Sequence, residues 1–382
     1  MNFTPTFEQE QIRKMVEEFV AKEVSPNAKK WDEDEDFTPI DKLMREKMGP
    51  MGLLGLPYPK EYGGGGSDQV AYTLVNFELN KACASTGVGY SVHISLGTWP
   101  IFYYGTEEQK RKYCPKLASG EYLAAFALTE PGAGSDSAAQ LSTAVEDGDS
   151  YILNGTKCFC TNAGFAEVYV VFAMTDKSKG TKGISAFIIE KGTPGFGFGK
   201  QELKMGIRGS VQREVVMENC RIPKSSLLSK EGDGFKIAMT TLDGGRIGIA
   251  AQGVGIAMGA YEYALKYAKE RIQFNQPISA QQAISFKLAA MATKINAAKW
   301  LVLHAAYLKD NGKPFSKEAA MAKLFATDTA MEVTTEAVQV LGGHGFLRDH
   351  PVERMMRDAK ITQIYEGTNE IQHIVIAGSI LR

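Results

Sequence analysis

The run Val168-Tyr-Val-Val-Phe-Ala-Met174 is the part of the chain that decides the fold. Its β-branched and aromatic residues follow one another without a polar interruption, which is typical of a strand buried on both faces. Similar short runs, separated by clusters of Gly, Asn, Asp and Lys, occur at residues 123–128, 151–153, 184–190 and 214–217. These runs predict a compact β domain over residues 122–230.

Helical periodicity surrounds this β region on both sides. Before it, Thr6 and Gln9 form a capping-box pattern ahead of an apolar stripe. After it, short breaks separate long amphipathic segments, as in an antiparallel bundle, at residues 234–270, 280–310, 317–341 and 370–381. The predicted fold is α+β and multidomain: an N-terminal helical domain (1–121), a small middle β-barrel or sheet (122–230) and a C-terminal four-helix bundle (231–382).

Composition excludes several classes of partner. The 382 residues carry 43 Lys and Arg against 44 Asp and Glu, a net charge of −1, which argues against nucleic acid or an anionic membrane as a partner. No apolar stretch approaches the roughly 18 residues of a membrane span, and the N-terminus lacks a basic segment leading into an apolar one. The five cysteines have no disulfide-framework spacing, and the pair at 158 and 160 is too close for an ordinary metal site. We expect a cytoplasmic protein without a metal.

The chain lacks a Gly-x-Ser-x-Gly elbow, a His-Glu-x-x-His motif and a complete dinucleotide fingerprint. Three other stretches, two of which contain glycines, are candidates for ligand binding. The segment 128–136 combines glycines, hydroxyls and carboxylates after a strand. Phe159-Cys-Thr-Asn162 lies on the next strand, and Gln339-Val-Leu-Gly-Gly-His-Gly-Phe346 ends a helix in glycines. Glycine lets a ligand approach the backbone. A tight surface turn and an ordinary glycine helix cap are the structural alternatives for the first and third.

The stretch Gln363-Ile-Tyr-Glu-Gly-Thr-Asn-Glu-Ile-Gln372 places one carboxylate, Glu366, between an apolar run and a Gly-Thr-Asn break. A structural role is the simplest interpretation: Thr368 or Asn369 caps the following helix, and Glu366 is solvated beside it. A catalytic carboxylate is the alternative.

Six segments in register identify the chain as similar to one family, the acyl-CoA dehydrogenases, over essentially its whole length. They are residues 127–136 (ALTEPGAGSD), 243–246 (DGGR), 271–274 (RIQF), 339–343 (QVLGG), 357–360 (RDAK) and 364–368 (IYEGT). The chain most resembles the bacterial short-chain branch, the butyryl-CoA dehydrogenases, through residues 239–251 and 351–368.

This resemblance implies FAD as the cofactor, bound by two sets of residues that belong to different subunits. The first set, expected to face the isoalloxazine, is Phe126, Ala127, Leu128, Thr129, Gly134, Ser135, Phe159, Cys160 and Thr161, with hydrogen bonds donated by Thr129 and Thr161. The second, for the diphosphate and adenosine, is Arg271, Phe274, Gln282, Gln339, Val340, Leu341, Gly342 and Gly343. Thr368, Asn369 and Glu370 are expected to contact FAD as well. A shared site implies a homo-oligomer, expected to be a dimer of dimers.

The resemblance also implies the chemistry. Glu366 is expected to abstract the α-proton of a short-chain acyl-CoA such as butyryl-CoA while the β-hydride passes to flavin N5, giving crotonyl-CoA. The Glu366 N–H would bind the thioester carbonyl. The expected substrate contacts are Ser135, Asp243, Gly244, Gly245, Arg246, Tyr365 and Gly367. The base position that some branches use corresponds to Gly245, which carries no carboxylate.

Two departures from the family pattern, and the expected acyl cavity, bear on the properties of the flavin site and on substrate specificity. Phe159 stands where the family usually has Trp beside the flavin, and His344 stands where relatives often have Asn or Tyr. The acyl cavity is expected to be lined by residues 91–98, through Val92, Ile94 and Leu96, and by Tyr365 at a strand end. His93 and Phe159 leave open the alternative that the substrate carries a polar or an aryl-acryloyl group.

Electron-transferring flavoprotein is the expected redox partner. An enoyl-CoA reductase component of an electron-bifurcating complex would carry the same residues and is the alternative function. A catalytically silent flavin-binding scaffold is a further alternative, which the presence of Glu366 disfavours.

Overall fold

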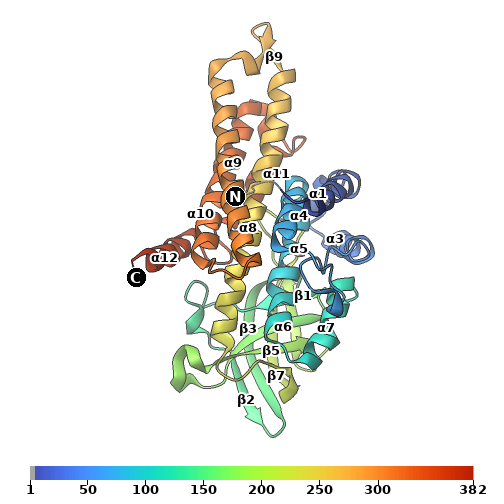
Figure 1. Ribbon diagram of the computed structural model, residues 1–382, viewed down its shortest axis with the longest axis vertical. Coiled ribbons are helices and arrows are strands. Elements are labelled where there is room, and N and C mark those ends of the chain that lie inside the picture. The colour runs from blue at the N-terminus through green and yellow to red at the C-terminus, as the bar shows by residue number, and fades with distance from the viewer. Residues whose placement is uncertain (1–4, 382) are drawn as a thin grey trace.

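The computed structural model describes residues 5–381, so the outer limits of the first and third expected domains, residues 1–4 and 382, lie outside the described residues. Figure 1 shows three parts along the long axis: a sheet at one end, a long helical hairpin at the other, and the N-terminal helices beside the middle. The predicted three-part fold is confirmed.

The N-terminal part is a set of helices packed on one another and on the sheet. It comprises α1 (Phe7–Phe19), α2 (Ala28–Asp34), α3 (Thr38–Leu43), α4 (Gln69–Ala82), α5 (Ala84–Ser91), α6 (Trp99–Tyr104) and α7 (Glu107–Ser119). The capping box predicted at Thr6 is present, since its side chain accepts from Gln9 N and the Gln9 side chain accepts from Thr6 N. A wide π-helical segment, Val92–Thr98, continues α5 toward the interior.

The middle part is an eight-stranded sheet whose path ends at β6 and β8. Its strands are β1 (Ala124–Ala127), β2 (Thr143–Asp147), β3 (Ser150–Thr161), β4 (Val168–Met174), β5 (Ile184–Glu190), β6 (Phe196–Gln201), β7 (Gln212–Pro223) and β8 (Leu227–Leu228). All seven residues of β4 are buried, which explains its unbroken apolar run. Strand β4 pairs parallel with β1 and antiparallel with β5. The order is β6-β7-β3-β2-β4-β5-β8, with β1 on β4.

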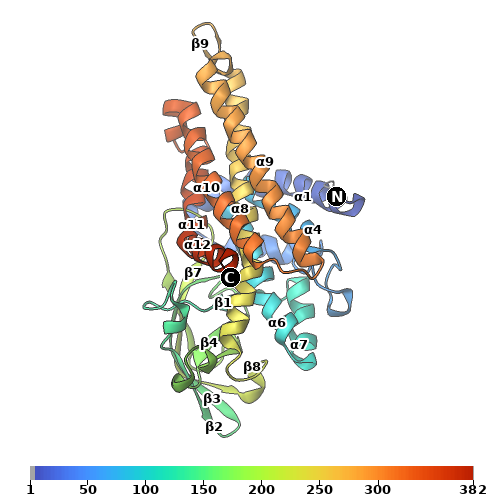
Figure 2. The same cartoon turned by 60° about the vertical axis from the view of Figure 1, so that its left-hand side comes forward.

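The C-terminal part is built on one long helix. It contains α8 (Gly234–Glu270), the short hairpin β9 (Ile272–Gln273) and β10 (Gln276–Pro277), α9 (Gln282–Asp310), α10 (Ser316–Leu341), α11 (Val352–Thr362) and α12 (Asn369–Ile380). Helix α8 begins beside the sheet, where Gly232 N donates to Ser185 Oγ at 3.0 Å, and α4 and α10 both pack against it (Figure 2). At 1.5 Å per residue its 37 residues span about 55 Å, which places β9 and β10 far from the sheet.

One sequence expectation about this part is wrong. The run ending at Tyr365 was expected to be a strand, but it follows helix α11. The buried residues Val352, Met355, Ala359 and Thr362 recur at helical spacing and pack the helix on its neighbours. In residues 5–381, no helix is long and apolar enough to cross a membrane.

Candidate active site

Glu366 occupies the turn that joins α11 to α12. Its φ is 53° and that of Gly367 is 91°, so two consecutive residues are left-handed, and at Gly367 glycine is the residue that adopts this conformation without strain. Thr368 caps α12, as its Oγ1 accepts from Ile371 N at 3.4 Å. Glu366 takes no part in the cap: both carboxylate oxygens are buried, and neither has a hydrogen-bond partner among residues 5–381. The solvated carboxylate of the structural interpretation is therefore wrong.

The carboxylate of Glu366 lies against a glycine of α8. A Cβ atom at Gly245 would collide with Glu366 Oε2 and would lie 2.9 Å from Leu96 Cδ2. Gly245 is the position at which some branches of the family carry the catalytic carboxylate. Here the absence of a side chain at Gly245 leaves the space that the Glu366 carboxylate fills.

Burial and two cations set the charge of Glu366. Burial raises its pKa to about 8, and the charges of Lys323 and Arg246 oppose this rise without cancelling it. Lys323 is fully buried, and its Nζ donates to Gly367 O at 2.9 Å and to Asn369 Oδ1 at 2.8 Å. Burial lowers the pKa of Lys323 to about 7. Arg246 is also buried and pairs with Asp243 at 2.5 Å. With a pKa of about 8, the Glu366 carboxyl group can exchange its proton close to neutral pH.

The walls beside Glu366 are apolar, but only part of the expected lining contributes. Val92 and Leu96, one helical turn apart, belong to the buried cluster against which Tyr365 packs. Ile94 belongs to a different cluster, shared with the sheet, because it faces the opposite side of the helical segment. The Tyr365 hydroxyl donates to Gln252 Oε1, which fixes the ring.

His93 points away from the apolar side chains beside Glu366 and bonds to the backbone of two other segments. Its Nδ1 accepts from Ala124 N at 3.1 Å, and its Nε2 lies 3.1 Å from Leu117 O. The side chain is fully buried, and burial lowers its pKa to about 4, so it is a neutral structural group. The expectation that His93 leaves room for a polar acyl group is wrong.

A buried ion pair shapes the glycine-rich loop after β1. Lys157 is fully buried on β3, and its Nζ donates to Glu130 Oε1 at 2.7 Å, to Leu128 O at 3.2 Å and to Gln140 Oε1 at 3.1 Å. Glu130 also accepts from the backbone N–H groups of Leu141 and Ser142. Cβ atoms at Gly132 and Gly134 would meet nothing within 4 Å, so the loop faces open space.

The C-terminal end of β3, beside this loop, presents an aromatic ring. Cys158 N donates to Thr129 O, and the register of β3 with β7 shifts between Lys157 and Cys160. At this bulge Phe159 has a φ of 57° and is 67% exposed. The Thr161 hydroxyl accepts from Gln212 Nε2 at 3.2 Å, which leaves its own hydrogen free to donate. The side chain of Cys160 is buried, so only its backbone is available to a ligand.

The remaining first-set residues surround this end of β3: Phe126 and Thr129 are partly buried, Ala127 and Leu128 are buried, and Ser135 is exposed. Phe126 and Tyr365 both pack against the buried cluster that contains Leu96. This shared contact places the C-terminal end of β3 on the same side of the molecule as Glu366. An exposed ring, threonine hydroxyls and a glycine loop open to solvent fit a planar ring with polar edges, as in a flavin.

The second expected cofactor set lies at the other end of α8. Arg271, Phe274 and Gln282 are exposed around the β9–β10 hairpin, and Phe274 is 88% exposed. The glycines that follow α10 lie beside this end, since the His344 ring centroid is 6.0 Å from that of Tyr267. Gln339, Gly342 and Gly343 are exposed, whereas Val340 and Leu341 are buried. The length of α8 separates the two sets within one chain.

The residues of the third set, at the start of α12, differ in whether their side chains are available to a ligand. Asn369 is buried, with its amide bonded to Lys323, Thr327 and Asp328, so its side chain is fully engaged within the chain. Thr368 and Glu370 line a pocket of about 300 Å³ next to Ile364. These two remain available to a ligand.

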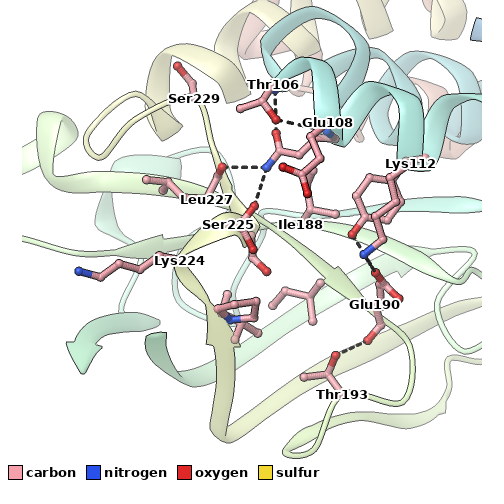
Figure 3. A pocket seen from close by; sticks show the side chains of 16 residues that line it. Thr106, Glu108, Lys112, Ile188, Glu190, Thr193, Lys224, Ser225, Leu227 and Ser229 are labelled. Carbon is pink, nitrogen blue, oxygen red and sulfur yellow. Dashed lines mark hydrogen bonds and ion pairs between the residues drawn. The ribbon is translucent and has the colours of Figure 1, made fainter. Parts of the chain in front are cut away.

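A second pocket, of about 410 Å³, lies between α7 and the sheet, away from Glu366 (Figure 3). One carboxylate in it is paired: Glu190 accepts from Lys112 at 2.6 Å and from Tyr113 at 2.8 Å. It contains no buried unpartnered group comparable to Glu366 among the described residues.

Two motif residues prove to be structural. Arg357 pairs with Asp32 of α2 and Glu353 of α11, and Asp358 accepts from Ile207 N at 2.5 Å. They hold α11 against the N-terminal helices and the sheet.

Sequence reasoning missed Lys323, Lys157 and Glu130. For Lys323 a signal exists: it falls on the buried alanine stripe of α10, with Ala319, Ala326 and Ala330 at helical spacing. A charge on an apolar stripe needs a partner.

Comparisons with known proteins agree with this arrangement. Family models for the acyl-CoA dehydrogenase N-terminal, middle and C-terminal domains match residues 6–121, 125–220 and 232–381. The short-chain specific acyl-CoA dehydrogenase of Clostridium acetobutylicum is 53% identical over 382 residues, covering 100% of both chains. The structure of butyryl-CoA dehydrogenase from Megasphaera elsdenii matches with a TM-score of 0.97 and 48% identity, covering 100% of both chains.

A second solved structure is equally similar. It comes from work on the electron transferring flavoprotein of Acidaminococcus fermentans and flavin-based electron bifurcation, and it matches with a TM-score of 0.97 and 54% identity, again covering 100% of both chains. Similarity at this level over the full length shows common ancestry as well as a common fold. The chain therefore belongs to the acyl-CoA dehydrogenase family.

Proposed function

We propose that this protein catalyses the FAD-dependent α,β-dehydrogenation of short-chain acyl-CoA thioesters, with butyryl-CoA converted to crotonyl-CoA. One observation carries the proposal: the Glu366 carboxylate is buried beside apolar side chains, against Gly245 and near two cations, and has no hydrogen-bond partner among residues 5–381. A carboxylate used only for structure would be paired, because an unpaired buried charge is costly.

The expected cofactor residues fit FAD when two chains are combined. Thr129, Thr161 and the exposed Phe159 ring would hold the isoalloxazine of one chain, with Thr368 and Glu370 nearby. Arg271, Gln282 and Gly343 of a second chain would hold the diphosphate and adenosine. When bound, FAD supplies a hydride acceptor for the β-carbon. We therefore infer a homo-oligomer, assembled as a dimer of dimers.

The chain's own residues then perform the proton chemistry. Glu366 takes the α-proton: the Cα–H bond breaks, a carboxyl O–H bond forms, and the electron pair moves toward the thioester. The Glu366 N–H has no acceptor among the described residues, so it is free to donate to the thioester carbonyl, where negative charge develops. Arg246, Asp243 and Ser135 would contact the thioester. Val92 and Leu96 keep water from the reacting carbon.

We expect a short acyl chain, but not a long one, to find room beside Glu366. On α8, one turn after Gly245, a Cβ atom at Gly248 would lie 2.5 Å from Ser91 Oγ and 3.0 Å from Tyr72 Oη, so these side chains approach the helix closely. Leu96 and Tyr365 bound the other sides. A methylene without room loses roughly 0.8 kcal/mol of burial and adds overpacking strain. We expect kcat/KM for butyryl-CoA to exceed that for octanoyl-CoA by well over about tenfold.

Electron-transferring flavoprotein is the proposed redox partner. The similarity to the Acidaminococcus structure favours a second candidate, in which the protein reduces enoyl-CoA within an electron-bifurcating complex. The residues are the same in both directions, because a catalyst does not set direction. We infer a cytoplasmic location, since the five cysteines are free and buried, as suits a reducing compartment.

An anaerobic titration tests this function. Purified protein is expected to be yellow, and butyryl-CoA is expected to bleach the flavin absorbance, with octanoyl-CoA far less effective. Reoxidation by crotonyl-CoA and by electron-transferring flavoprotein would separate the two directions. Yellow protein whose flavin neither thioester bleaches would support the flavin-binding scaffold instead. Rapid bleaching by octanoyl-CoA, or a preference for an aryl-acryloyl thioester, would contradict the substrate assignment alone.

A further inference from the structure

Lys323 is a fully buried ammonium group on α10 that faces the turn carrying Glu366. Within residues 5–381 it forms no ion pair, and its two hydrogen bonds go to neutral oxygens, Gly367 O at 2.9 Å and Asn369 Oδ1 at 2.8 Å. Burying a charge on neutral partners costs more free energy than burying it in a direct pair. Its position therefore requires an explanation beyond packing.

The hydrogen bonds of Lys323 fix the turn after Glu366. Gly367 O accepts from Lys323 and also from Gln372 Nε2 at 2.7 Å, and Gln372 is itself fully buried. Asn369, the other acceptor, is held by Thr327 and Asp328 of the same helix α10. Helix α10 thereby fixes the backbone of the left-handed pair Glu366–Gly367 through Lys323. The Glu366 carboxylate remains free of these bonds and lies against Gly245 of α8.

The charged groups around Lys323 come from three elements. Arg246 of α8 lowers its pKa, whereas Glu366 in the turn, Asp328 of α10 and Glu370 of α12 raise it. Asp328 accepts from Asn369 and from Gln363, and Glu370 is exposed. Arg246 is neutralised by its pair with Asp243. Glu366 is thus the buried, unpaired carboxylate among these neighbours.

We propose that Lys323 is a positioning residue for the α,β-dehydrogenation: it holds the Gly367 carbonyl so that Glu366 faces the substrate, and it places a positive charge beside the carboxylate without bonding to it. This proposal rests on the function proposed above. The charge favours ionised Glu366 in an apolar cavity. The missing direct bond means that proton transfer to Glu366 breaks no ion pair.

The test compares Lys323→Met with Lys323→Arg, which keeps the charge and the donors, and with Lys317→Met. Lys317 lies on the same helix in a partly buried pair with Glu318, so it controls for loss of a lysine from α10. Two readouts are needed on the oxidised, FAD-loaded enzyme. One is the pH profile of kcat and kcat/KM with butyryl-CoA. The other is an isotope-edited infrared titration of the Glu366 carboxyl without substrate, its band assigned by its loss in Glu366→Gln.

In Lys323→Met, the infrared titration of Glu366 and the acid limb of kcat/KM are expected to move to higher pH by about one unit or more, the usual effect of losing a nearby opposite charge. The kcat at pH 7 should fall at least about tenfold. Lys323→Arg should restore most of both, and Lys317→Met should change neither. If Lys323→Met does not fold, Lys323→Gln, which keeps a donor but not the charge, is measured in its place with the same expectation for Glu366.

Unchanged titration of Glu366 in Lys323→Met or Lys323→Gln would overturn the proposal, even with reduced activity, since that result indicates a packing role. Failure of the proposed function looks different. Glu366→Gln that still bleaches with butyryl-CoA would reject the base assignment itself, whatever Lys323 does.

Discussion

Two regions of the molecule each bury a lysine beside a glutamate, and they use the pair differently. In the sheet, Lys157 and Glu130 are bonded directly at 2.7 Å, and Glu130 accepts two backbone N–H groups as well. Under the helical bundle, Lys323 and Glu366 form no ion pair, and the carboxylate has no hydrogen-bond partner among residues 5–381. Both lysines are fully buried.

The pKa values of the two carboxyl groups move in opposite directions. Burial favours a higher pKa for Glu130, but the Lys157 charge and the backbone donors outweigh it, and the pKa falls below its ordinary value. For Glu366 burial dominates and raises the pKa to about 8. Direct bonding produces a permanent structural charge, whereas separation produces a group that can exchange a proton.

The largest effect should come from removing the exchangeable proton site. Glu366→Gln is expected to bind FAD and butyryl-CoA but to lose at least about 10³-fold in the rate of flavin bleaching, because a general base is lost. Stopped-flow absorbance measures this rate. Glu332→Gln removes a carboxylate from an exposed pair with Lys294 and serves as the control. Near-normal bleaching in Glu366→Gln would assign the base elsewhere.

Breaking the structural pair should destabilise the fold instead. Lys157→Met leaves Glu130 buried without its cation and is expected to lower the free energy of unfolding by about 3 kcal/mol, the low end for a broken buried pair. The low end applies because Leu141 and Ser142 still donate to the carboxylate. Urea unfolding measures the change, and Lys224→Met, from an exposed pair with Glu146, should stay within about 1 kcal/mol of wild type. Equal losses in both variants would refute the distinction.

Displacing the Glu366 carboxylate without changing its chemistry should have a somewhat smaller effect. In Gly245→Ala the new methyl group would occupy the place of Glu366 Oε2, and a misplacement of about 1 Å can cost about 10²-fold in rate. The expected result is reduced kcat with FAD content unchanged. A Cβ atom at Gly378 of α12 would meet nothing within 4 Å, so Gly378→Ala is the matched glycine control. Wild-type kcat in Gly245→Ala would mean that the carboxylate is not held where the structure places it.

The last effect concerns stability as a function of pH. Because the folded pKa of Glu366 is raised, the folded state holds this proton where the unfolded state has released it. Glu366 therefore costs the wild type stability as pH rises from about 4.5 to about 8, by up to about 1.4 kcal/mol per pH unit. Glu366→Gln should be more stable relative to wild type at pH 8 than at pH 5. Thermal unfolding at the two pH values measures this, and a pH-independent difference would argue against the raised pKa.

The sequence predicted elements best where one periodicity dominates a long stretch. The limits 234–270, 168–174 and 184–190 agree with α8, β4 and β5. Strands β2 and β6 were missed because half-exposed strands mix polar and glycine residues, and α11 was missed because charged residues interrupt its apolar stripe. The domain limits at 121 and 230 remain predictions.

For the site, resemblance singled out Glu366, but the sequence could not reveal its surroundings. The partner of a buried lysine depends on contacts between distant segments, as for Lys323 with Gly367 or Lys157 with Glu130. The lining by Ile94 and the role of His93 were wrong for a related reason. Which side of a helical segment faces the cavity depends on how it packs on the sheet.

The length of helix α8 sets the distance between the two halves of the expected cofactor site. Its 37 residues connect the sheet, which would hold one end of a cofactor, to the hairpin tip, which would hold the opposite end of a different cofactor molecule. Each inserted residue would lengthen the helix by about 1.5 Å and turn the tip by about 100°. The relative placement of the two halves of the shared cofactor site would therefore depend on the number of residues in α8.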